Sequence, residues 1–154
     1  MSPEQSPGTI ELAPDACWAL LRTSDVGRLA VVVDSRPEIF PVNFAVDHGT
    51  VVLRTAQGPK LSAALEAPVA FEVDGYEAGT AEAWSVVVKG HARQLRGTDE
   101  LIDTVGIPLS PWHRTAKPQF LRITPDELTG RRFVRAPAGT WDTPITGTRP
   151  TAPE

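Results

Sequence analysis

Alternation of apolar and polar residues dominates the middle of the chain. From Gly27 to Val33, and again from Glu38 to Asp47, apolar side chains recur at every second position, which is the spacing of a strand with one buried face. His48-Gly49 then has the composition of a tight hairpin turn. The pattern predicts strands over 27–33, 38–47, 51–55, 68–74, 83–95 and 119–124, with a last one over 131–135 after a bend at 128–130.

Two short segments have helical spacing instead. Asp15 is placed as the N-cap of a helix that ends near Arg22, and residues 60–66 form the second. Short strands joined by short turns favour antiparallel pairing. The expected fold is therefore mainly β, an antiparallel barrel that is closed or partly closed, and a sandwich is the alternative.

Composition narrows the class of protein. The chain has 154 residues, of which 41% are hydrophobic and 22% are charged, as expected for one globular domain. A mobile arm is predicted for residues 1–10, the domain for 11–135, and a Pro/Thr-rich disordered tail for 136–154. No apolar run is long enough for a membrane helix, and the first residues lack the features of a signal peptide, so a cytoplasmic location is expected.

Charge and side-chain chemistry exclude several functions. The net charge of −4 disfavours a general nucleic-acid binder. The three histidines stand far apart without a second ligand at metal-binding spacing, so no metal site is expected. Cys17 falls on the inner face of the first helix, which is typical of a core residue rather than a nucleophile. No side chain is nominated as catalytic.

One turn has the chemistry of an anion site. The first 83 residues contain only five Lys and Arg side chains, and two of them, Arg54 and Lys60, flank a single loop. Thr55 adds a hydroxyl and Gly58 an accessible backbone, at the positive end of the second helix. This combination suits a phosphate group, and a solvated turn with two unrelated charges is the alternative.

The strand before that turn has an unusual outer face. Pro41 costs a ladder hydrogen bond and Asn43 is a poor strand former, while Val42 lies between them. An edge strand with one face in solvent is one interpretation. The other is that these residues offer small side chains to a flat ligand, over which Trp112, in a proline-bounded segment, is placed to stack.

In combination these segments resemble the pyridoxamine 5′-phosphate oxidase-like superfamily of flavin-binding split β-barrels, and most closely its short actinobacterial members, which bind FMN or a deazaflavin. The resemblance covers residues 11–135. The matching segments are Asp25-Val26-Gly27-Arg28-Leu29-Ala30, Pro41-Val42-Asn43-Phe44, Leu53-Arg54-Thr55 with Gly58 and Lys60, residues 69–74, residues 84–90 and residues 129–133.

The resemblance implies a homodimer with FMN bound in clefts between the subunits. By position, Arg54, Thr55, Gly58 and Lys60 hold the phosphate, while Pro41, Val42 and Asn43 line the ring. Trp84, Ser85 and Trp112 close the cleft, with the partner subunit as one source of these three residues.

The implied function is that of an oxidoreductase acting on an unidentified small molecule. The chain lacks the C-terminal Arg-x-His with which pyridoxamine phosphate oxidases hold their substrate, so vitamin B6 oxidation is not expected. A deazaflavin-dependent reductase and a non-enzymatic flavin carrier or sensor are the alternatives.

Overall fold

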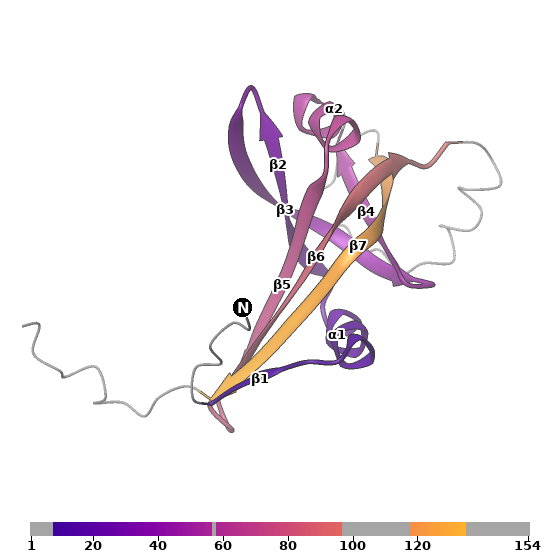
Figure 1. Cartoon of the computed structure of the whole chain (residues 1–154). Helices are drawn as coiled ribbons and strands as arrows, with labels where there is room; N and C mark the ends of the chain where they lie inside the picture. Colours follow the sequence, from indigo (N-terminus) through magenta and orange to yellow (C-terminus); the bar gives the residue numbers. More distant parts are fainter. Residues whose placement is uncertain (1–7, 57, 97–117, 135–154) are drawn as a thin grey trace, which may run out of the picture.

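The computed structural model describes residues 8–56, 58–96 and 118–134 (Figure 1). Seven strands and two helices occur in these ranges. Their order along the chain is β1 (Thr9–Glu11), α1 (Pro14–Leu21), β2 (Val26–Val33), β3 (Arg36–Asp47), β4 (Thr50–Ala56), α2 (Pro59–Glu66), β5 (Val69–Glu77), β6 (Glu82–Gln94) and β7 (Pro118–Val134). The predicted tail 136–154 and Trp112 lie outside the described residues.

Six of the strands close into a ring. Hydrogen-bonded neighbours follow the order β7-β4-β3-β2-β5-β6, the pairing of β6 with β7 completes the circle, and every pair is antiparallel. Strand β1 adds to the outer edge of β7. The predicted split β-barrel is therefore confirmed, and the sandwich alternative is wrong.

Two tight turns shape the first half of the barrel. His48 and Gly49 both have positive φ angles, 46° and 71°, as the hairpin turn predicted there requires. The preceding hairpin turns at Asp34 and Ser35, with φ angles of 50° and 62°. Arg36 already pairs with Val33 across this turn, so β3 begins earlier than the sequence pattern indicated.

Two further local predictions are wrong. The N-cap of α1 is Ala13, and Asp15 lies in the first turn of the helix. The bend expected at residues 128–130 is absent, because β7 runs without interruption and changes register against β6 between Lys89 and Gly90. The register shift lets the strand pass through Pro125, which pairs with Gly90, without ending there.

The core fills the ring and extends toward both helices. Phe44 and Phe71 meet edge to face, with ring centroids 4.9 Å apart. Leu61 and Ala64 of α2 join this cluster, as do Cys17 and Leu21 of α1. The two helices lie toward opposite ends of the molecule (Figure 1). In the described ranges, no helix has the length and apolar character needed to cross a membrane.

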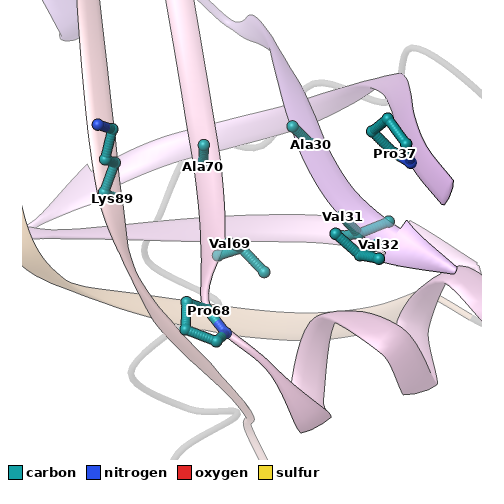
Figure 2. A pocket seen from close by; sticks show the side chains of 8 residues that line it. All are labelled: Ala30, Val31, Val32, Pro37, Pro68, Val69, Ala70 and Lys89. Atoms are coloured by element: carbon teal, nitrogen blue, oxygen red, sulfur yellow. The ribbon is translucent and has the colours of Figure 1, made fainter. Parts of the chain in front are cut away.

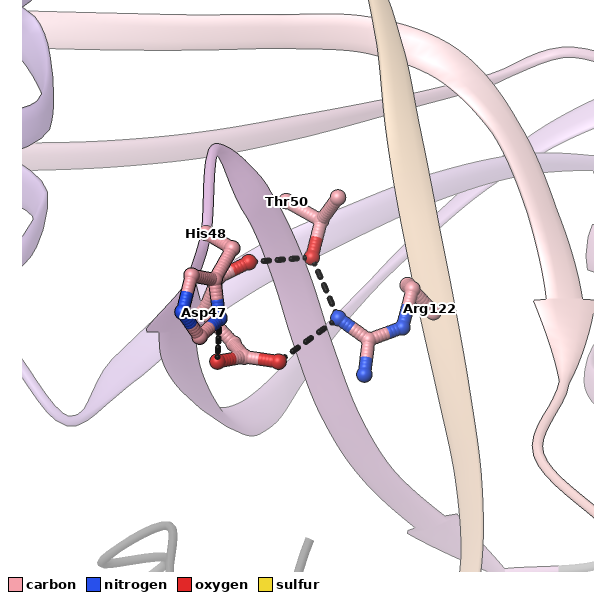
Figure 3. A network of polar contacts seen from close by, with 4 residues as sticks. All are labelled: Asp47, His48, Thr50 and Arg122. Atoms are coloured by element: carbon pink, nitrogen blue, oxygen red, sulfur yellow. Dashed lines mark hydrogen bonds and ion pairs between the residues drawn. The ribbon is translucent and has the colours of Figure 1, made fainter. Parts of the chain in front are cut away.

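A polar network fastens the β3–β4 hairpin to β7 (Figure 3). Arg122 donates hydrogen bonds to Asp47 (2.9 Å) and to Thr50 (2.6 Å), and the Thr50 hydroxyl donates to the Asp47 carbonyl (2.6 Å). The Arg122 hydrogen bond is the main reason why the pKa of Asp47 lies below its usual value, and His48 contributes further in the same direction. These contacts hold the tip of the β3–β4 hairpin against β7.

This network predicts a pH-dependent contribution to stability. Because the pKa of Asp47 is lowered by folding, its contribution is complete above the unfolded-state pKa, about 3.9, and is lost as the pH falls below that value. Asp47→Asn is expected to cost about 1.5 kcal/mol at pH 7 and little at pH 3, measured by urea unfolding. Asp34→Asn, at an exposed turn, is the control. An unchanged cost at both pH values would refute the role assigned to the carboxylate.

Candidate functional site

The register of β3 and β4 places Asn43 directly opposite Arg54. Both lie on the outer face of the barrel wall, because their neighbours Phe44 and Leu53 pair in the core. Asn43 is the one buried polar residue in the described ranges, with 6% of its surface exposed. β3 is flanked by β2 and β4, so the edge-strand interpretation of this segment is wrong.

Arg54 is half-buried and incompletely paired. Its Nε is shielded from solvent and has no hydrogen-bond partner in the described part of the chain. A buried guanidinium donor without an acceptor costs free energy, and functional sites are where such costs are found. The position beside Asn43 therefore suits a bound acceptor, and an anionic one above all.

The loop after Arg54 leads to an open helix end. Thr55 carries its hydroxyl in an exposed position, where it donates weakly to the Ala56 carbonyl (3.4 Å). Gly58 is the N-cap of α2, and no side chain caps this terminus. Beyond its chain neighbours, no atom of the described residues lies within 4 Å of the place where a Cβ on Gly58 would sit, so the backbone there is approachable. Lys60 occupies the first turn, which contains no acidic residue. This end of α2 keeps its positive polarity.

The three residues predicted to line the flat ring of a ligand, Pro41, Val42 and Asn43, do not all face the same side of the barrel wall. Pro41 is exposed on the outer face, opposite Arg28. The side chain of Val42 is 4% exposed and belongs to the core, so only its backbone reaches the outer face. Pro41, Asn43 and Arg54 therefore form the outer surface of the candidate site.

Trp84 and Ser85 lie elsewhere on the same chain. Ser85 pairs with Asp74 of β5 and Trp84 with Gly75, so that β2 and β5 stand between these residues and Asn43. Two intervening strands mean a separation of roughly 14 Å at the usual spacing between strands. Trp84 and Ser85 also point to opposite faces of β6. On the other side of the ring only β7 lies between β6 and β4, but Arg54 pairs with Phe120 and Trp84 with Arg132, twelve residues apart along β7. Within one chain, the structure therefore does not bring Trp84 and Ser85 to Arg54.

A charged cluster that the sequence did not predict lies on β2 and β5, between β3, which carries Asn43, and β6, which carries Trp84 and Ser85. Arg28 lies 3.7 Å from Glu72 and 3.3 Å from Asp74, and it pairs directly with Pro41 on its other side. Burial, and after it Asp74, raise the pKa of Glu72, whereas Arg28 lowers it. The alternation of Phe71-Glu72-Val73-Asp74 placed both acids on one face, but their approach to Arg28 depends on the pairing of β2 with β5.

Neither of two cavities that described residues line includes Arg54. The first has a volume of about 270 Å³ and lies on the outer face of β2 and β5 (Figure 2). Its lining is aliphatic apart from Lys89 at one side. The second, of about 500 Å³, lies between α1 and the far ends of β5, β6 and β7, and it contains Trp84.

The described residues offer little to metal or thiol chemistry. They contain no group of three or more His, Cys, Asp and Glu side chains that could hold a metal ion. Cys17 is fully buried, and burial raises the pKa of its thiol. A raised pKa keeps the thiol protonated and unreactive, so the core role predicted for Cys17 is confirmed.

Comparisons with known proteins match the whole barrel. Residues 13–132 fit the family described as pyridoxamine 5′-phosphate oxidase. An uncharacterized protein of Mycobacterium tuberculosis is 32% identical over 139 residues, which are 86% of this chain and 91% of that protein.

Solved structures agree with this assignment. An FAD-binding protein of Mycobacterium smegmatis is 39% identical, with a TM-score of 0.71 over 81% of this chain and 98% of that one. A Corynebacterium glutamicum protein, provisionally described as a pyridoxamine 5′-phosphate oxidase, is 34% identical, with a TM-score of 0.74 over 86% and 98%. The fold, the order of the matching segments and these similarities show that the chain belongs to the pyridoxamine 5′-phosphate oxidase family.

Proposed function

We propose that this chain binds a flavin nucleotide, FMN in the first instance, on the outer face of β3 and β4. The observation that carries the proposal is the Nε of Arg54, which is buried near the buried Asn43 and has no hydrogen-bond partner among the described residues. The 39% identical protein of Mycobacterium smegmatis is described as FAD-binding, which supports a flavin in this branch of the family.

The residues present fit the two ends of such a cofactor. Arg54 and the uncapped end of α2, with Gly58, Lys60 and the Thr55 hydroxyl, supply positive charge and donors for a phosphate. Pro41 and the Val42 backbone offer a flat surface, and Asn43 offers an amide for a polar ring edge. Trp84, Ser85 and Trp112 are assigned to the closing side of the cleft, with Trp84 and Ser85 coming from a partner subunit because within one chain they stand apart from Arg54.

The proposed activity is an oxidoreductase reaction on a small molecule. A bound flavin supplies the hydride chemistry, while the protein binds, orients and shields. No side chain of the outer face is assigned a catalytic role. Separate titrations of the apoprotein with FMN, FAD and a deazaflavin nucleotide distinguish the cofactors. Tight deazaflavin binding without FMN binding would favour the deazaflavin reductase, whereas flavin binding without turnover would favour a carrier or sensor.

Lys60→Ala tests the phosphate end of the site. The variant is expected to bind FMN about tenfold more weakly than the wild type, because one cationic contact is removed. Its affinity for riboflavin, which lacks the phosphate, is expected to stay within twofold. Both affinities are measured by the quenching of flavin fluorescence. Equal losses for the two ligands would remove Lys60 from the phosphate site.

A homodimer is part of the proposal, because the barrel exposes an apolar outer face. Val32 is 54% exposed and Ile39 is 71% exposed, beside the aliphatic hollow of Figure 2. Exposed apolar surface of this kind is suited to an interface.

Ile39→Lys is expected to convert the dimer to a monomer in sedimentation experiments and to weaken FMN binding at the same time, because the cleft lies between subunits. Ile10→Lys, at a position on β1 that is 63% exposed, serves as the control and is expected to leave both properties unchanged. A monomeric wild-type protein that binds FMN tightly would overturn the dimer.

A further inference from the structure

The second cavity of this chain shares only Trp84 with the proposed flavin site, and the other residues that line it are different. Its volume is about 500 Å³, within the usual range of small-molecule pockets. Leu20 and Thr23, from the end of α1, form one side. The other side is the sheet extension, which contributes Glu77, Glu82, Trp84 and Arg132.

One wall of the cavity is an aromatic ring fixed by a glycine. Gly75 pairs directly with Trp84 across β5 and β6. A Cβ on Gly75 would lie 2.5 Å from both Cε2 and Nε1 of the indole, and 2.7 Å from Cζ2. The indole therefore lies against the glycine backbone, in space that any side chain at position 75 would need. Trp84 also lines the cavity, together with Leu20 and Thr23.

The residues that line the cavity carry an excess of negative charge. Glu77 and Glu82 pair directly across the hairpin, an arrangement of like charges that is unfavourable by itself. Arg132 lies 3.9 Å from Glu82, and Glu77 accepts a hydrogen bond from the Thr80 hydroxyl (3.2 Å). Of the residues that line the cavity, two are acidic and one is basic, and Glu77 has no ion-pair partner among the described residues.

We propose that this cavity binds a flat aromatic organic cation, with its ring stacked on Trp84 and its positive charge beside Glu77. The indole face attracts a cationic ring, and a positive charge near Glu77 relieves its repulsion with Glu82. Leu20 encloses the apolar edge of the ring. This site does not depend on the proposed flavin function.

Isothermal titration of the full-length protein with 1-methylnicotinamide and with neutral nicotinamide tests the proposal, because the two probes differ chiefly in charge. At low ionic strength the cation is expected to bind about fivefold more tightly, the equivalent of ~1 kcal/mol. Glu77→Gln is expected to abolish this preference and to leave nicotinamide binding unchanged. Glu66→Gln, at the end of α2, is the matched control and keeps the preference.

Two further variants test the aromatic wall. Trp84→Leu is expected to weaken both probes about tenfold, and Trp84→Phe, which keeps a ring over Gly75, is expected to weaken them less than threefold. Equal affinity of the wild type for the two probes overturns the proposal. So does a Glu77→Gln variant that retains the preference. The titrations are made on the apoprotein without FMN, because Trp84 is also assigned to the proposed flavin cleft.

Discussion

Arg54→Met is expected to lower the affinity for FMN by about 30-fold and to leave the affinity for riboflavin within twofold. The guanidinium is half-buried, and its Nε has no partner in the described part of the chain. In the proposed complex a phosphate oxygen is its acceptor. Hydrogen bonds that involve a charged group contribute about 1.5–3 kcal/mol, which corresponds to roughly 10- to 150-fold in affinity. Methionine keeps the length of the side chain and removes the charge.

Two matched variants make this test specific. Arg54→Lys is expected to recover part of the FMN affinity, because the charge remains while the planar fork of donors is lost. Arg36→Met, on the exposed β2–β3 hairpin, is expected to bind FMN like the wild type. If Arg54→Met binds FMN normally, or loses riboflavin to the same extent, the phosphate does not lie at Arg54.

Gly90→Ala is expected to lower the free energy of unfolding by about 3 kcal/mol. A Cβ on Gly90 would lie 2.1 Å from the Thr124 carbonyl oxygen and 3.1 Å from the Pro125 Cα. Both are backbone atoms of β7 at the register shift, so the added methyl cannot be accommodated by a side-chain rotation. The β6–β7 pair closes the barrel, and displacing it loosens the whole ring.

Urea unfolding of the variant measures this loss, with Gly79→Ala as the control. A Cβ on Gly79 would have no atom of the described residues within 4 Å, apart from its chain neighbours. Gly79→Ala is therefore expected to change the free energy of unfolding by no more than about 0.5 kcal/mol. The two variants share the same chemical change and differ only in what the methyl group meets. Equal stability of the two proteins would contradict the tight approach of β6 to β7.

Local chemistry explains what the sequence could predict. The His48-Gly49 turn and the alternation along β3 depend on neighbouring residues alone, and both appear in the structure as expected. Arg54 and the N-terminus of α2 are four residues apart along the chain, so their combination at one loop was visible as well. The short strands and turns already favoured a closed or partly closed barrel, and the family resemblance added the order of the matching segments.

Long-range pairing explains what the sequence could not predict. The burial of Asn43 depends on β4 and β2 lying on either side of β3, which no local pattern specifies. Pro125 normally ends a strand, and only the register shift against Lys89 and Gly90 allows β7 to continue. The approach of Glu72 to Arg28 follows from the order of strands around the ring. The separation of Trp84 from Arg54 follows from the register with which β4 and β6 pair with β7.

The central claim is that a phosphate-bearing flavin binds beside Arg54. It is tested most directly by titrating the purified apoprotein with FMN and riboflavin and following flavin fluorescence and the melting temperature. We expect saturable FMN binding, weaker riboflavin binding, and a melting temperature that rises with FMN concentration. A protein whose fluorescence signal and melting temperature do not respond to FMN, FAD or a deazaflavin nucleotide would contradict the account.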